Sequence, residues 1–432
     1  MKPTLHTRRE FLRQSIGLVS VAWTVPTFLD RTVLALENPV TGTPAVWTGA
    51  EPILVVIQLS GGNDSLNTIV PYGDDLYYKA RPDIGIPANQ ALKINDTFGF
   101  HPQCAKFKEL FDGGRMAILH GVGYPNPNRS HFRSMEIWHT ASDSNRHETH
   151  GWIGRYFDHA CKGCDPATAI NIGKLTPQAF SGPTPFGMSI EDPEMYRWMN
   201  TSGTSEAAMK KADSFFRKLN DGKQPAALSS PKMGQEMMEA GSVDYLQRTA
   251  LNAQLSSDKV RDVVKKYRST VTYPDTDIAY GLKLVAQMIA GNMPTRVYYV
   301  SQGGYDTHAN QLADQAELLG DLSSAVAAFY QDLEQQRNID RVLSFAFSEF
   351  GRRVAENASG GTDHGSGGGI LVFGSRIKPG FHGQHPSLAS LLNGDLKHSV
   401  DFRSVYATVL EKWLKAKSEP ILGRAFPKLE FV

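Results

Sequence analysis

Carboxylates and imidazoles recur at five places along the sequence, each of which adjoins an apolar run. Asp64 follows the first run, Asp306 and His308 follow the third, and Asp363 and His364 precede the last. Carboxylates supply charge and neutral imidazoles a directional nitrogen, which suits Zn²⁺ or Mn²⁺ and, with fewer histidines, Mg²⁺ or Ca²⁺. Each residue alone has a simpler explanation, because aspartate beside glycine or asparagine often forms a turn. Their recurrence predicts a divalent metal site, with zinc preferred, and the expected ligands are Asp64, Asp306, His308, Glu349, Asp363 and His364.

A hydroxyl and three guanidiniums accompany these groups. Ser130 follows a Pro/Asn turn and precedes a predicted helix at 132–140. It fits two roles: a helix N-cap, or a nucleophile at a helix N-terminus, where backbone N–H groups also hold phosphate or sulfate. Arg129, Arg133 and Arg352 add positive charge, and guanidinium groups bind oxyanions with paired hydrogen bonds. These four residues are the candidate catalytic residues.

Apolar, β-rich runs and helical periodicity indicate the elements that position these groups. Continuous apolar runs are typical of strands buried on both faces of a parallel sheet. Alternation with helical segments predicts an α/β fold, a mostly parallel sheet sandwiched by helices. Ligands bind beyond the carboxyl ends of such strands, so the chemically active groups should share one edge. The expected strands are 53–60, 115–122, 296–301, 342–347 and 370–374, and the expected helices 104–111, 132–140, 311–336 and 401–414.

One segment interrupts this alternation. Residues 201–267 are rich in Met, Lys, Glu, Ser and Ala and have helical periodicity without a strand-like run. We therefore expect one α/β domain over 36–432 with a helical insertion at about 201–267.

The first 35 residues have the features of an export signal. Arg8 and Arg9 precede the apolar stretch 16–29, and small side chains lead to a plausible cleavage point after Ala35. Paired arginines favour the twin-arginine route. The stretch is shorter than the ~20 residues that span a bilayer. We expect export by the twin-arginine machinery, a periplasmic or secreted mature protein and no stable membrane span.

Composition limits the remaining function classes. With 45 Lys+Arg against 44 Asp+Glu, the chain lacks the basic excess typical of nucleic-acid binding. Three cysteines exclude a disulfide framework. Cys161 and Cys164 could form a local disulfide or half a zinc site, and we expect neither. His382 and His385 lie in a Gly/Pro loop and are expected at the surface.

Five motifs carry a resemblance to a known superfamily. They are QLSGGNDSLNTIVP at 58–71, SHFR at 130–133 with WHT at 138–140, GGYDTH at 303–308, SEFGRR at 348–353 and TDHG at 362–365. Their order is similar to that of the alkaline phosphatase superfamily, which includes sulfatases and cofactor-independent phosphoglycerate mutases. From about residue 52 to 414 the chain more closely resembles an uncharacterised exported family of that superfamily, known as a domain of unknown function. The resemblance implies an alkaline-phosphatase-like fold.

The resemblance also implies roles for single residues. Asp64 matches the first-strand metal ligand, whereas Asp306, His308 and His364 match the ligands of one ion. Glu349 and Phe350 stand where the hydrolases carry Asp-His, so a second ion loses an imidazole. In an alternative alignment, Asp363 and His364 correspond to that Asp-His pair, and His382 or His385 corresponds to the late metal-binding histidine. We prefer the first alignment. Ser130 approximates the nucleophile, although alignment on residues 138–140 places His131 there.

We therefore expect an exported metal-dependent hydrolase of phosphate or sulfate esters. In this hypothesis Asp306, His308 and His364 hold one ion, and Asp64 and Glu349 hold or bridge a second. The alternative is a non-catalytic exported binding protein whose degenerate metal pocket holds an anionic glycan or a partner protein. A mutase or transferase is a third possibility. The expected ligand is a small anionic ester or glycan.

Overall fold

The computed structural model describes residues 51–161, 164, 166–183, 187–193 and 259–432. The chain divides into two compact units, residues 40–189 with 263–432, and residues 1–39 with 190–262. The predicted export signal and residues 201–258 of the predicted insertion lie outside the described residues. The fold below is that of the unit formed by 40–189 and 263–432.

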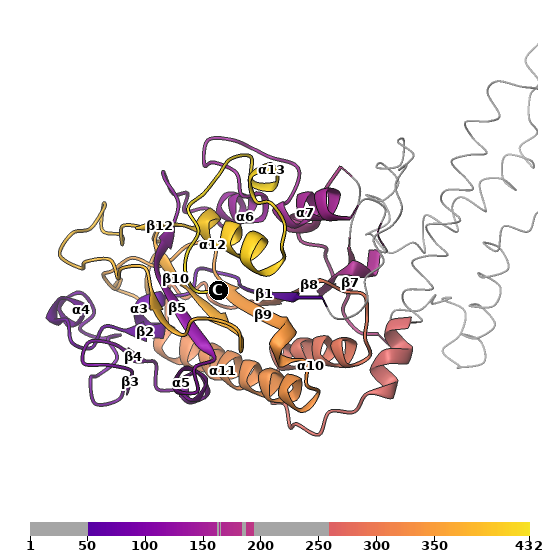
Figure 1. The fold of residues 1–432 in the computed structure, drawn as a ribbon. Coiled ribbons are helices and arrows are strands. Elements are labelled where there is room, and N and C mark those ends of the chain that lie inside the picture. Colours follow the sequence, from indigo (N-terminus) through magenta and orange to yellow (C-terminus); the bar gives the residue numbers. More distant parts are fainter. Residues whose placement is uncertain (1–50, 162–163, 165, 184–186, 194–258) are drawn as a thin grey trace, which may run out of the picture. The chain divides into compact units, whose positions relative to one another are not determined.

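A mixed, mostly parallel sheet forms the centre of this unit (Figure 1). Its strand order is β11-β5-β10-β9-β1-β8-β6-β7, and β12 also pairs with β5. Strand β1 runs parallel to β8 and β9, whereas β10 runs antiparallel to both β9 and β5. A second, antiparallel sheet has the order β2-β4-β3. The strands are β1 Ile53–Leu59, β2 Ile69–Val70, β3 Leu92–Lys93, β4 Gly99–Phe100, β5 Met116–Gly123, β6 Ala169–Ile172, β7 Met188–Ile190, β8 Val297–Gln302, β9 Val342–Phe347, β10 Gly368–Phe373, β11 Gly380–His382 and β12 Val400–Asp401.

Helices cover both faces of the large sheet (Figure 1). On one face, Trp138 of α6, Trp152 of α7 and Tyr406 of α12 pack in a core that includes Val56 and Phe345 of the sheet. On the other face lie α5, α10 and α11. The helices are α3 Ser65–Thr68, α4 Asp75–Ala80, α5 Ala105–Asp112, α6 His131–Thr140, α7 Trp152–Ala160, α10 Asp277–Ala290, α11 Gln311–Gln335, α12 Phe402–Thr408 and α13 Glu419–Leu422, and a π-helical turn, Val409–Trp413, follows α12.

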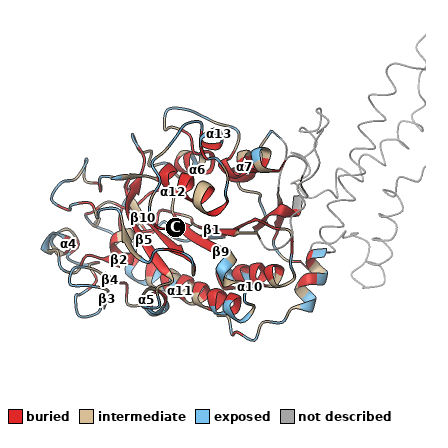
Figure 2. Ribbon diagram, viewed as in Figure 1, coloured by how far each residue is buried: buried red, intermediate tan, exposed pale blue. Residues whose placement is uncertain are grey.

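Burial follows the predicted pattern. The sheet and the inner sides of its helices are buried, and the outer sides of the helices and many loops are exposed (Figure 2). Six of the seven residues of β1 are buried, as expected for a strand covered on both faces. All five predicted strands and the helices predicted at 104–111, 132–140 and 311–336 are confirmed within two residues. The segment predicted as one helix at 401–414 is a short α-helix continued by the π-helical turn.

The sequence reasoning missed several elements of the sheet and its helical layers, among them α7, the strands β6, β7, β11 and β12, and α10. Strand β6 has only four residues, too few for a recognisable strand pattern. Helix α10 is capped by Thr276, whose side chain accepts from the backbone N–H of Ala279. Nine of its fourteen residues are buried, and the exposed face is narrow, with Asp277, Tyr280 and Lys283 one turn apart.

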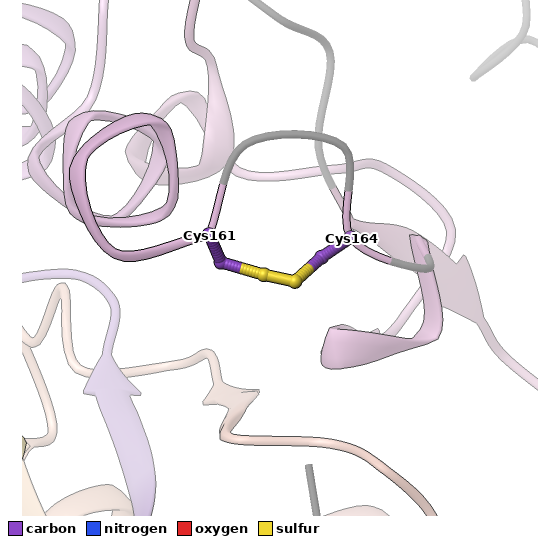
Figure 3. Close-up of a disulfide and its surroundings, with 2 residues drawn as sticks. All are labelled: Cys161 and Cys164. Atoms are coloured by element: carbon purple, nitrogen blue, oxygen red, sulfur yellow. A yellow bond between two sulfur atoms is a disulfide. The ribbon is translucent and has the colours of Figure 1, made fainter. Parts of the chain in front are cut away.

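A disulfide follows α7. Cys161 and Cys164 are joined, with their Cα atoms 5.6 Å apart (Figure 3). Our expectation that these residues form neither a disulfide nor a metal site is wrong for the disulfide. The two-residue spacing brings the cysteines within the Cα separation that a disulfide requires. Cys104 is buried and unpaired.

None of the helices in the described ranges combines the length and the apolar character needed to cross a bilayer.

Candidate metal centre

Three side chains from distant parts of the sequence meet at the carboxyl edge of the large sheet. His131 is the first residue of α6 after β5, Asp306 lies in the loop after β8, and His364 lies in the loop before β10. Since β10 runs antiparallel to β9, its start lies at the edge where β9 ends. One ligand atom from each of the three residues lies within 4.8 Å of the other two.

The spacing of these atoms fits a small divalent ion. His364 Nε2 lies 2.9 Å from Asp306 Oδ1, and His131 Nε2 lies 3.4 Å from Asp306 Oδ2. In a tetrahedral zinc site with bonds of about 2.0–2.1 Å, neighbouring donor atoms are about 3.3 Å apart. Two imidazoles and one carboxylate therefore stand at ligand separation.

His308 brings a third imidazole to the same carboxylate. Its Nε2 lies 3.1 Å from Asp306 Oδ1 and 2.9 Å from the Nε2 of His364. Two ring nitrogens at this distance share a hydrogen bond or a common electrophile. The side chains of His308 and Asp306 are 45% and 49% exposed, so the cluster is open to solvent.

The other ring nitrogen of each histidine has an acceptor. His131 Nδ1 lies 2.8 Å from Glu349 Oε1, His308 Nδ1 lies 3.2 Å from Asp363 Oδ1, and His364 Nδ1 lies 2.8 Å from the backbone oxygen of Arg129. When an ion is bound, an acceptor at Nδ1 favours the tautomer that presents the Nε2 lone pair to the ion; without an ion, Nε2 of His364 is the atom that donates to Asp306. Metal-bound histidines almost always donate their second N–H to a carboxylate or carbonyl in this way.

Glu349 and Asp363 therefore lie behind histidines. Glu349 is buried, and its Oε1 also accepts a 2.9 Å hydrogen bond from the backbone N–H of Gly61. Hydrogen bonds from Asn357 and His308 lower the pKa of Asp363 below its ordinary value, despite an opposing contribution from burial. The structure places both residues where they orient a ligand.

Arg352 joins the loops that carry the centre. It is buried, and it donates to the carbonyls of Gly62, Thr362 and Tyr305 at 2.6, 2.9 and 2.7 Å. It also donates to Asp306 Oδ1 at 2.8 Å. Burial by itself raises the pKa of Asp306, but hydrogen bonds from His364 and Arg352 outweigh burial and hold that pKa well below its ordinary value. Asp306 is therefore a carboxylate at neutral pH.

The predicted ligand Asp64 lies apart from this cluster. It is buried, and its carboxylate forms a 2.5 Å ion pair with Arg81. It also accepts hydrogen bonds from Gln311 and from the backbone N–H of Leu66. Of the six predicted ligands, all except Asp64 are neighbours in the structure. Asp306, His308 and His364 direct ligand atoms at one point, and Glu349 and Asp363 contact the far nitrogens of histidines.

The predicted catalytic residues are less well placed. Ser130 is exposed, occupies the N-cap position of α6 and makes no side-chain capping hydrogen bond. Arg133 pairs with Glu136 at 2.7 Å and donates to the carbonyls of Asp143 and Ser144. Arg129 pairs with Asp395, and its side chain is 38% exposed. The backbone oxygen of Arg129 lies 2.8 Å from His364 Nδ1.

The sequence reasoning did not assign His131 to the metal. The sequence offered it only as the alternative to Ser130 at the nucleophile position, and its place after a strand that ends at the same edge was the signal that could have identified it. Phe350 packs against the rings of His131 and His364, with centroids 5.0 and 4.6 Å away, and forms an apolar wall of the centre. In the alternative register the late ligand is His382 or His385, but His382 Nε2 lies 2.7 Å from the carbonyl of Lys378. The ring of His385 is tilted against that of Phe98, with the centroids 4.8 Å apart.

Comparison with known proteins assigns the chain to a family. Residues 52–417 match the family described as "Protein of unknown function (DUF1501)", and the chain belongs to that family. A comparison with curated proteins finds no matching relative.

Several solved structures resemble this chain at low similarity. The lipoteichoic acid synthase LtaP from Listeria monocytogenes has a TM-score of 0.34 and 9% identity, over 84% of this chain and 78% of that one. The PsFucS1 sulfatase from Pseudoalteromonas sp. has a TM-score of 0.33 and 9% identity, over 87% and 68%. A protein in the alkaline phosphatase superfamily from Vibrio parahaemolyticus has a TM-score of 0.33 and 9% identity, over 93% and 78%. At scores this low, the chemistry of this chain must be argued from its own side chains.

Proposed function

We propose that this chain is an exported, metal-dependent hydrolase of phosphate or sulfate esters. One observation carries the proposal: three imidazoles direct Nε2 at a single ionised carboxylate, Asp306, while each Nδ1 meets an acceptor. A bound cation requires this arrangement: side chains that coordinate it directly, and acceptors behind them that fix the orientation of each imidazole.

The donor set favours zinc. His131, Asp306 and His364 would hold the ion, and His308 is the fourth donor within reach. Nitrogen donors with one carboxylate suit Zn²⁺, and Mn²⁺ is the next candidate; Mg²⁺ and Ca²⁺ prefer oxygen. An ion held there supplies Lewis acidity, which polarises an ester oxygen and stabilises the charge that develops on it.

The chain's own residues would bind and orient the anionic ester. Arg129, whose backbone oxygen contacts His364, has a partly exposed side chain and is the candidate to bind a phosphate or sulfate oxygen. Arg352 keeps Asp306 ionised and positioned from within the protein. The hydroxyl of Ser130 makes no hydrogen bond with any described residue that would activate it, so water is the expected nucleophile.

Export is part of the proposal. The paired Arg8 and Arg9 before an apolar stretch favour the twin-arginine route. The disulfide between Cys161 and Cys164 adds support, because disulfides persist in oxidising compartments such as the periplasm and are rare in the cytosol.

The second candidate is a non-catalytic binding protein for an anionic glycan or a partner protein. The apolar wall formed by Phe350 and the unengaged Ser130 favour it. On this alternative the ion is retained and no ester is cleaved.

Turnover separates the two candidates. Protein loaded with Zn²⁺ or Mn²⁺ is assayed with p-nitrophenyl phosphate and p-nitrophenyl sulfate, beside His364→Ala and the control His382→Ala. Hydrolysis predicts metal-dependent release of p-nitrophenol that His364→Ala abolishes and His382→Ala keeps. Protein that binds the ion but releases no product from either ester favours the binding protein.

A further inference from the structure

A buried ion pair occupies the position from which Asp64 was expected to bind a second metal ion. The side chains of Arg81 and Asp64 are 0% and 1% exposed. Arg81 Nη1 lies 2.5 Å from Asp64 Oδ2 and Arg81 Nη2 lies 3.1 Å from Asp64 Oδ1, so the pair is bidentate. Bidentate guanidinium–carboxylate pairs are strong and geometrically specific.

Both partners are saturated by further hydrogen bonds. Asp64 Oδ2 also accepts from Gln311 Nε2 at 2.5 Å, and Oδ1 from the backbone N–H of Leu66 at 3.1 Å. Arg81 also donates to Asn67 Oδ1 at 2.6 Å and to the carbonyls of Val354 and Arg353 at 2.9 and 3.0 Å. A metal ion that bound Asp64 would have to displace a guanidinium that has no route to water. A buried charge that loses its partner is strongly destabilising.

The pair is also connected to the loops of the metal centre. Gln311 is fully buried at the start of α11, and its Oε1 accepts from Thr307 at 3.2 Å and from Thr362 at 2.6 Å. Thr307 lies between Asp306 and His308, and Thr362 precedes Asp363. The carboxylate of Asp64 therefore supports both ligand-bearing loops through one glutamine.

We propose that Arg81 is the permanent cation of Asp64, in place of a second metal ion, and that the chain binds a single divalent ion. The guanidinium supplies the charge and the cross-links that a second ion would supply, and its charge does not depend on metal supply because arginine stays protonated. Glu349 does not provide an alternative second site, since its Oε1 is shared by His131 and Gly61. The inference rests on the proposed metal centre and specifies how many ions that centre holds.

The test counts bound ions. Full-length protein is stripped with a chelator, reloaded with excess Zn²⁺ or Mn²⁺, passed through gel filtration and analysed for metal per chain. The matched variant is Asp64→Asn with Arg81→Met, which removes both charges together and leaves no unpaired buried ion. His131→Ala with His364→Ala shows which residues hold what is bound.

One equivalent in the wild-type protein, lost in the histidine variant, is the expected result. The Asp64→Asn/Arg81→Met protein should also bind one equivalent, but with a weaker affinity, because the Asp64 carboxylate that holds Gln311 against the two ligand-bearing loops is gone. Two equivalents in the wild-type protein overturn the inference and leave the proposed function intact. No retained ion in the wild-type protein removes the proposed metal centre and this inference with it. The wild-type count decides the question even if the double variant does not fold.

Discussion

Replacement of Glu349 by glutamine distinguishes a residue that orients a ligand from a residue that is a ligand. Glu349 Oε1 lies 2.8 Å from His131 Nδ1 and 2.9 Å from the backbone N–H of Gly61. Its Oε2 accepts from Ser348 Oγ at 3.2 Å. Glutamine has the same shape and can keep an acceptor toward His131 and Gly61. The substitution therefore removes the charge that makes His131 a stronger donor and keeps the hydrogen bonds.

The size of the effect follows from this geometry. Loss of such an outer partner lowers metal affinity by about 10–100-fold, and a change that keeps the hydrogen bonds should lie near tenfold, about 1.4 kcal/mol. If Glu349 were itself a ligand, it would carry a share of the ~10–16 kcal/mol typical of a four-donor zinc site. About 3 kcal/mol for one donor corresponds to a loss of more than ~100-fold.

Competition of the protein with a chromogenic zinc chelator measures this affinity directly. The matched control is Glu334→Gln, which changes an exposed glutamate paired with Arg115. We expect about tenfold weaker binding for Glu349→Gln and no change for Glu334→Gln. Unchanged affinity in Glu349→Gln would show that the negative charge behind His131 does not contribute to ion binding. Near-complete loss of the ion would show that Glu349 is a ligand, as the sequence suggested.

Three further changes test other parts of the account. Gly61→Ala places a Cβ 2.3 Å from the backbone nitrogen of Asp306, and Gly61 has a φ of +123°, so we expect loss of ion binding and a lower Tm. The control is Gly303→Ala, where a Cβ meets nothing within 4 Å, and this variant should match the wild type. Burial lowers the pKa of His139 to about 4, so the unfolded chain takes up a proton first as the pH falls, and stability should decrease by about 2 kcal/mol between pH 7 and pH 5 through this residue. In urea unfolding, the free energy of unfolding of His139→Gln should depend less on pH than that of the wild type. An equal pH dependence contradicts the burial argument. Cys161→Ser opens a loop of a few residues and should lower stability by about 2 kcal/mol, an effect that dithiothreitol reproduces in the wild type only if the disulfide forms.

The layers of the fold could be predicted because the pattern is local. Strand β1 is buried on both faces and reads as a continuous apolar run, which needs no knowledge of its neighbours. The shared edge followed from the same reasoning, since parallel strands end together, and it brought Asp306, His308 and His364 into one cluster. The antiparallel direction of β10 depends on pairing with β5 and β9, which no local pattern specifies.

The division of roles within the cluster depends on contacts between distant residues. His131 and Glu349 are 218 positions apart, and only their 2.8 Å contact shows that the imidazole faces the centre and the carboxylate stands behind it. Asp64 looks like a ligand from its position after β1. Its partner Arg81, at the C-cap of α4, reaches back over 17 positions in a way that no spacing rule indicates.

The central claim is that His131, Asp306 and His364 hold a divalent ion, and elemental analysis of the purified protein tests it most directly. Protein purified without added chelator is compared with the Asp306→Ala/His364→Ala variant, and circular dichroism confirms that both are folded. We predict one equivalent of a divalent ion, zinc first and manganese next, in the wild-type protein and none in the variant. Folded wild-type protein that takes up no ion from Zn²⁺ or Mn²⁺, or equal ion content in the two proteins, would contradict the claim.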